Sequence, residues 1–105
     1  MPPLTLTHQE MTVIVRKRLA QFPSTFDFNS VVKSVASYLI KEGIGFNAES
    51  HTTYQPNMDW NGIALIREII WDHIILRYVT VGGYGKDDWP NLMITQRGKL
   101  FFASV

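Results

Sequence analysis

The hydrophobic positions in the first part of the chain repeat at helical spacing. From residues 11 to 22, apolar side chains recur three and four positions apart, which predicts a helix with one buried face. Thr7 and Glu10 stand at the spacing of a capping box just before this stretch, so we expect the helix to begin there. Pro23 should mark its end, because proline cannot continue a helix.

A second apolar stripe of the same period runs from residue 31 to residue 40. Asp27 or Asn29 can cap the start of this helix after a loop at residues 24–26, and Gly43 can close it in the left-handed conformation. The following segment, residues 44–58, is rich in Asn, Ser, Thr and Gly. It is either a long loop or a loop that encloses a short strand.

The pattern changes in the third predicted helix, which starts near Asp59 or Asn61 and runs to about Arg77. Apolar residues occupy nearly every side of it, as is typical of a helix surrounded by protein. We therefore expect this helix to be the centre of the domain or partly a subunit interface.

The remaining residues predict two strands and a short helix. Residues 78–81 and 91–95 are rich in β-branched, aromatic and aliphatic residues, and the segment between them is dense in turn residues. Thr95 can cap a last helix, and Gly98 lets its first turn approach the hairpin closely. The predicted fold is α+β, a single domain over residues 1–105 with a small three-helix core and a C-terminal two-stranded β-hairpin.

This order of elements resembles the winged helix-turn-helix superfamily. The turn Ile94-Thr95-Gln96-Arg97-Gly98 is similar to the Leu/Ile-Thr-x-x-Gly exit from the wing in many such domains. Trp89-Pro90 resembles a feature of some uncharacterised bacterial winged-helix-like proteins. The likeness rests on motifs in the terminal part of the chain and on element order alone in the first half.

The resemblance implies a DNA-binding transcriptional regulator that contacts double-stranded DNA through its third helix and wing. The residues predicted to bind nucleic acid are Arg67, Lys86, Asn61, Arg16 and Lys17. A solvated helix face is the simpler interpretation of the basic cluster at residues 16–18.

The acidic residues of the third helix favour an alternative. Glu68 and Asp72 lie one turn apart and would repel phosphates. The alternative is a protein–protein interaction or homodimerisation module of winged-helix shape that does not bind DNA. Phe101 and Phe102 are candidates for a dimer interface, because adjacent helix residues cannot both face one small core fully.

Composition and charge narrow the prediction mainly by exclusion. The net charge of +1 argues against nucleic-acid binding by bulk charge, and the absence of cysteine excludes disulfides and thiolate chemistry. The three histidines are not at metal-ligand spacing, and no nucleophile motif is present. We therefore predict no enzyme activity, metal or cofactor.

The start of the chain lacks the features of a signal peptide, and no apolar run has membrane length, which predicts a soluble, cytoplasmic protein without a membrane partner.

Overall fold

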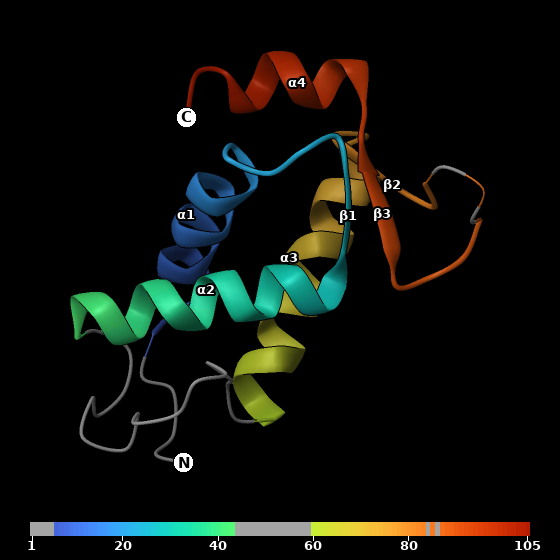
Figure 1. Cartoon of the computed structure of the whole chain (residues 1–105). Coiled ribbons are helices and arrows are strands. Elements are labelled where there is room, and N and C mark those ends of the chain that lie inside the picture. Colours follow the sequence, from blue (N-terminus) through green and yellow to red (C-terminus); the bar gives the residue numbers. More distant parts are fainter. Residues whose placement is uncertain (1–5, 44–59, 84, 86) are drawn as a thin grey trace.

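The structure is a computed structural model that describes residues 6–43, 60–83, 85 and 87–105. These residues form an α+β fold, as the sequence predicts (Figure 1). The elements in chain order are α1 (His8–Leu19), β1 (Thr25–Asp27), α2 (Phe28–Glu42), α3 (Trp60–Ile75), β2 (Val79–Val81), β3 (Asn91–Ile94) and α4 (Gln96–Phe102).

The three strands form one antiparallel sheet in the order β1-β3-β2. β2 and β3 pair antiparallel, with Val79 opposite Ile94, but they belong to a three-stranded sheet and not to the predicted two-stranded hairpin alone. The loop predicted at residues 24–26 is wrong, because Thr25–Asp27 pairs with the other side of β3. Three residues are too few to show the alternation that identifies a strand, so this pairing depends on the neighbouring strand and has no local signal.

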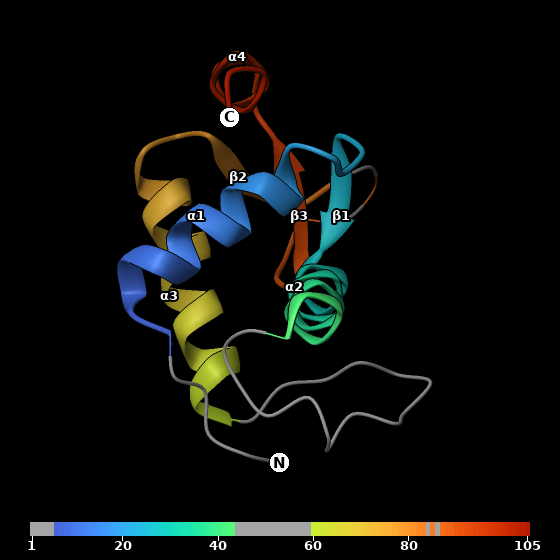
Figure 2. The ribbon, with the colours of Figure 1, turned by 90° about the vertical axis from the view of Figure 1, so that its left-hand side faces the viewer.

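The core lies where α1, α2 and α3 meet one face of this sheet. Figure 2 shows α2 and α4 nearly end-on, at opposite ends of the strands, with α1 crossing in front of α3. Every strand except β1 contributes a fully or nearly fully buried side chain. The buried hydrophobic residues are Met11, Ile14, Val15, Leu19, Phe28, Val31, Val32, Val35, Ala36, Leu39, Ile66, Ile69, Ile70, Val79, Leu92, Ile94 and Phe102.

The helix ends follow the local signals in the sequence. Both hydrogen bonds of the capping box between Thr7 and Glu10 are present. Asp27, rather than Asn29, caps α2 by accepting a hydrogen bond from the Ser30 amide at 2.7 Å. Gly43 ends α2 with a φ of 65°, in the left-handed region that glycine adopts without strain.

Helix α3 is not enclosed on all sides within this chain, so of the two expectations the subunit interface is the one that stays a prediction. Its buried side is formed by Ile66, Ile69 and Ile70, whereas Trp60 and Ile75 are each 75% exposed. Among the helices in the described ranges, none has the length and hydropathy that crossing a bilayer requires.

The exit from β3 into α4 has the predicted geometry. The Thr95 hydroxyl accepts a hydrogen bond from the Gly98 amide at 2.9 Å and donates one to the Arg77 carbonyl at 2.6 Å. A Cβ at position 98 would collide with the Tyr78 carbonyl, so only glycine fits there. These contacts hold α4 against the residues that join α3 to the start of β2.

Candidate interaction surface on helix α3

One side of α3 presents large apolar side chains to solvent. Because an α-helix turns about 100° per residue, positions three and four apart lie on the same side. Trp60, Trp71 and Ile75 are 75%, 44% and 75% exposed on this side. We call this side the α3 surface, and it consists of Trp60, Ala64, Arg67, Glu68, Trp71 and Ile75.

Aromatic rings from α2 and the hairpin support one flank of the α3 surface. Trp71 stacks on Trp89 with ring centroids 5.8 Å apart, and Trp89 contacts Phe28 at 5.0 Å. The Arg67 guanidinium lies 5.5 Å from the centroid of the Phe28 ring and 5.9 Å from that of Trp89. These cation–π contacts fix the position of the positive charge on this flank.

The opposite flank, beside the start of α1, is negatively charged. The Nε2 atom of His8 lies 3.4 Å from a carboxylate oxygen of Asp72 and 3.9 Å from one of Glu68. All three side chains are about half-exposed or more, so water screens these contacts. The α3 surface therefore has a positive flank and a negative flank on either side of an apolar centre.

The buried side of α3 contains His73, which is fully enclosed. Arg16 Nε donates a hydrogen bond to His73 Nε2 at 3.0 Å, so the imidazole proton lies on Nδ1, which donates to the Ile69 carbonyl at 2.7 Å. Burial lowers the pKa of His73, and the Arg16 charge lowers it further. Both ring nitrogens of His73 thus have hydrogen-bond partners, and the imidazole is neutral at pH 7.

The described residues among those predicted to bind nucleic acid come from two helices, α1 and α3. Asn61 and Arg67 are exposed on α3, and Lys17 is exposed on α1. Arg16 is half-buried against His73 and lies 5.0 Å from the centroid of the Phe101 ring. Lys86 lies outside the described residues.

The interpretation of residues 16–18 as a solvated face is correct only for Lys17. Arg16 reaches α3, and Arg18 donates a hydrogen bond to the Ser34 hydroxyl at 2.8 Å and lies over the Tyr38 ring. Guanidinium groups on long side chains can reach acceptors on neighbouring helices. No local sequence pattern identifies these acceptors, because they lie 16 and 57 positions away.

Both phenylalanines of the predicted dimer interface find contacts within the chain. Phe102 is 5% exposed and belongs to the core. Phe101 is half-buried and stacks on Tyr78 with ring centroids 4.1 Å apart. Because α4 lies over the junction of α3 and β2, adjacent residues can both be covered. A subunit contact through these rings stays a prediction, and Phe101 is the more accessible of the two.

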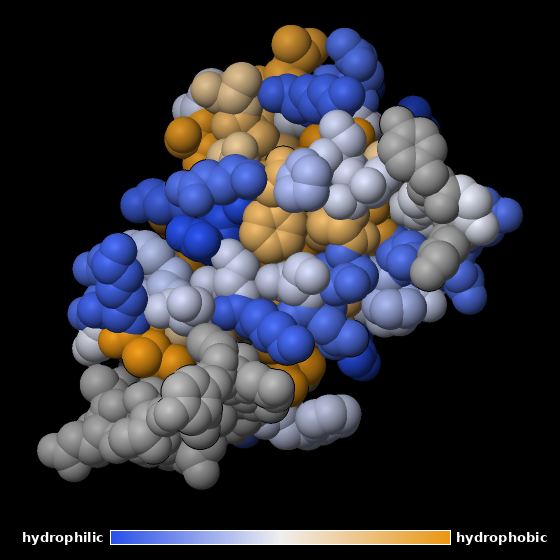
Figure 3. Space-filling model, in the orientation of Figure 1, coloured by the Kyte–Doolittle hydropathy of each residue, from blue (hydrophilic) through white to orange (hydrophobic). Residues whose placement is uncertain are grey.

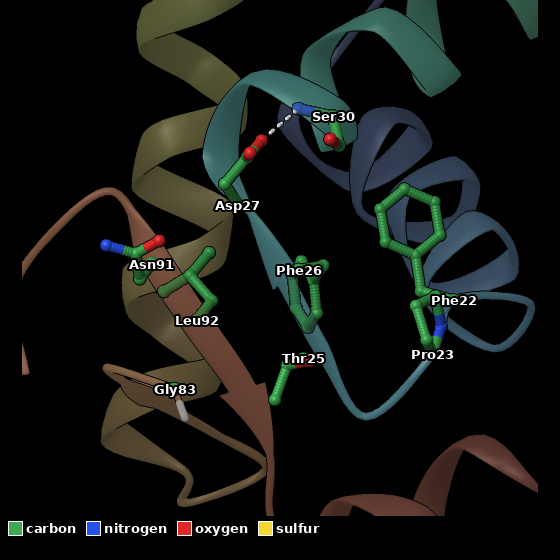
Figure 4. Close-up of a pocket in the computed structure, with 9 residues that line it drawn as sticks. All are labelled: Phe22, Pro23, Thr25, Phe26, Asp27, Ser30, Gly83, Asn91 and Leu92. Atoms are coloured by element: carbon green, nitrogen blue, oxygen red, sulfur yellow. Dashed lines mark hydrogen bonds between the residues drawn. The ribbon is translucent and has the colours of Figure 1, made fainter. Parts of the chain in front are cut away.

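A pocket of about 490 Å³ lies beside the edge strand β1 (Figure 4). Phe22 and Phe26 form one wall, with ring centroids 5.3 Å apart, and Leu92 and Gly83 lie across from them. Asp27 is the ionisable residue among the side chains that line it, and its carboxylate already caps α2. The pocket therefore gathers no set of groups for acid–base or nucleophilic chemistry.

The rest of the described surface offers weaker candidates for a binding site than the α3 surface does. In the orientation of Figure 3, which faces α1, α2 and α4, hydrophobic patches are small and hydrophilic side chains separate them. The described residues contain no group of three or more His, Cys, Asp or Glu side chains placed to hold a metal ion.

No protein-family model, curated protein or solved structure matches this chain.

The sequence left open whether the third helix is the centre of the domain or partly a subunit interface, and it singled out no side of the helix. The structure shows that the exposed side is the one that carries Trp60, Trp71 and Ile75. The spacing of Trp60, Trp71 and Ile75 along one side was a usable signal, since their positions differ by whole helical turns. The partner ring of Trp71, on Trp89, had no such signal.

Proposed function

We propose that this chain is a small winged-helix-type module that binds another protein through the α3 surface. The winged-helix assignment is supported by the order helix, strand, two helices and hairpin, and by a sheet in which β3 lies between β1 and β2. It is also supported by the Thr95 and Gly98 contacts at the exit from the hairpin. In such a fold α3 occupies the position of the recognition helix.

The character of the exposed side of α3 is the observation that carries this proposal. A helix that enters the major groove presents polar and cationic side chains to bases and phosphates. Here the exposed positions hold Trp60, Trp71 and Ile75, with Glu68 beside them. Each carboxylate on this side would repel phosphates, and large apolar groups gain most when a protein surface covers them.

The supported aromatic side chains are suited to anchoring a protein partner. Tryptophan and arginine are enriched among the residues that dominate binding energy at interfaces. Trp71 and Arg67 are already held by Trp89 and Phe28, so ordering them on binding costs little entropy. An exposed apolar group that is rigid before association favours recognition of a partner with a matching apolar face.

Binding of double-stranded DNA is the second candidate function. Arg67 and Asn61 are both exposed on α3, and Lys17 is exposed on α1, which favours this candidate. The acidic flank and the contacts that hold Arg16 inside the chain weigh against it.

Site-specific photo-crosslinking in cells tests the docking of a protein on α3. A benzoylphenylalanine at position 75 should give a crosslinked protein adduct, because this position lies within the α3 surface. Position 100 is the matched control, since Leu100 on α4 is 73% exposed and Ile75 is 75% exposed. The proposal fails if position 75 gives no adduct, or if adducts form equally at both positions.

A further inference from the structure

We propose that the partner of the α3 surface is a second copy of this chain, packed so that the two α3 helices run parallel across a two-fold axis. This inference rests on the proposed function, because it identifies the protein that occupies the same surface. It places the contact on α3 and not on Phe101 and Phe102. The arguments are the order of charges across the α3 surface and the apolar residues between them.

The charges on the two flanks determine which arrangement is favourable. Arg67 marks the flank beside Trp89, and Glu68 and Asp72 mark the flank beside His8. A two-fold axis parallel to the helices lays each flank against the opposite flank of the other copy. Arg67 then faces the partner's Glu68 and Asp72 at two symmetric places, and opposite charges meet.

The other symmetric arrangement of two helices is disfavoured by the same charges. When a two-fold axis is perpendicular to the helices, the helices run antiparallel and each flank meets its own equivalent. Arg67 would then lie beside the partner's Arg67, and Glu68 beside the partner's Glu68. Like charges placed together at an interface oppose association. The charge order thus selects the parallel pair.

The apolar centre of the surface fits the same arrangement. In a parallel pair, residues at equal heights meet their own equivalents, as in a parallel coiled coil. Ala64 gives the two backbones room to approach, and the exposed Trp71 and Ile75 side chains are covered on either side of the contact. A second copy supplies both this apolar stripe and the complementary charges.

Engineered cysteines test the geometry, and the natural chain has no cysteine to interfere. Under mild oxidation, Ile75→Cys should form a disulfide-linked dimer, because the two copies of residue 75 lie opposite each other. Leu100→Cys, with matched exposure on α4, should stay largely monomeric. In an antiparallel pair, residue 75 of one copy would lie near residue 60 of the other. A chain that forms the disulfide-linked dimer only when it carries cysteines at both positions 60 and 75 would overturn the proposal.

Charge reversal tests the same contact without a covalent bond. Analytical ultracentrifugation of the natural chain over a concentration series should give a monomer–dimer equilibrium. Arg67→Glu and Glu68→Arg should each weaken dimerisation at least about tenfold, equivalent to about 1.4 kcal/mol. The double variant should recover most of the loss, because the flanks are again complementary. Lys17→Glu, an exposed charge change on α1, should have no effect. Circular dichroism confirms that each variant is folded.

The outcomes separate this inference from the proposed function. A chain that is monomeric at all concentrations, together with a crosslink from position 75 to a different protein, overturns the second copy as partner and leaves protein docking intact. A dimer that is insensitive to both charge reversals also overturns the inference. Absence of any adduct at position 75, with a monomeric chain, overturns both.

Discussion

Burial in the core alters the chemistry of His73. A fully buried imidazole accepts a hydrogen bond from a cationic arginine, which requires that the ring itself be neutral. Phe102 stacks near the ring, with centroids 6.1 Å apart, and Tyr78 and Phe101 lie around it. The hydrogen bond between Arg16 and His73 joins α1 to α3 and directs the guanidinium of a basic residue toward the core.

The pKa of His73 is lower in the folded than in the unfolded chain, and this difference makes the folded protein less stable in acid. Burial and the charge of Arg16 lower this pKa in the folded state, while the hydrogen bond to the Ile69 carbonyl and the charge of Asp72 oppose the shift. The unfolded chain therefore binds a proton near the ordinary imidazole pKa of about 6.5, and the folded chain binds it only at lower pH. The contribution of His73 to the free energy of unfolding should therefore be constant above about pH 6.5, the pKa in the unfolded chain, and should fall as the pH drops below that value. For each unit by which the folded-state pKa is lowered, the loss of unfolding free energy in acid is about 1.4 kcal/mol.

Urea unfolding between pH 5 and pH 8 measures this dependence. His73→Gln should flatten the curve between pH 5 and 6.5, whatever its effect on stability at pH 7, because the titrating group is gone. His8→Gln, which removes an exposed histidine, should keep the loss of stability in acid. The carboxyl of Glu10, whose pKa is lowered by hydrogen bonds from Thr7, contributes only at more acidic pH. An unchanged curve for His73→Gln would contradict the assignment.

At the scale of elements, Thr95 joins three of them. Its hydroxyl donates to the Arg77 carbonyl after α3 and accepts from the Gly98 amide at the start of α4. Its backbone amide donates to the Tyr78 carbonyl just before β2 at 3.1 Å. A hydroxyl is therefore needed at this position both to cap α4 and to hold the turn after α3.

We expect Thr95→Val to lower the free energy of unfolding by about 1–3 kcal/mol. Valine keeps the β-branched shape, but it can neither donate to Arg77 nor accept from Gly98. Urea unfolding at pH 7.5 measures the change. Thr80→Val is the matched control on the exposed face of β2, and its effect should lie within about 0.5 kcal/mol. A loss for Thr95→Val no larger than for the control would show that the hydroxyl contributes little.

The sequence predicted the elements wherever a local signal exists. The capping box at Thr7, the left-handed Gly43 and the threonine and glycine around α4 depend on residues a few positions apart, so each could be found by spacing alone. Strand β1 and the exposed side of α3 depend on what lies beside them in space. Within the chain only one side of α3 is buried, and a subunit interface on its other side stays a prediction.

For the whole molecule, the candidate site could be predicted only in part. The acidic residues of α3 and their effect on phosphate binding were evident from the sequence. The support of Trp71 by Trp89 and Phe28 was not, because it joins α3 to the hairpin and to α2, which lie far apart in sequence. Arg16 was assigned to the surface because its acceptor on α3 could not be foreseen.

The distribution of charge over the molecule gives a prediction for DNA. The net charge is +1, Arg16 and Arg18 are held in contacts within the chain, and α3 has an acidic flank. We therefore expect no saturable binding of a random labelled duplex by fluorescence anisotropy in 50 mM salt, up to about 100 μM protein, the weak end of non-specific affinity. Arg67→Ala and Lys17→Ala should leave this result unchanged. Binding that weakens steeply with salt, and whose logarithmic salt slope falls by about one in Arg67→Ala, would instead favour DNA as the ligand of α3.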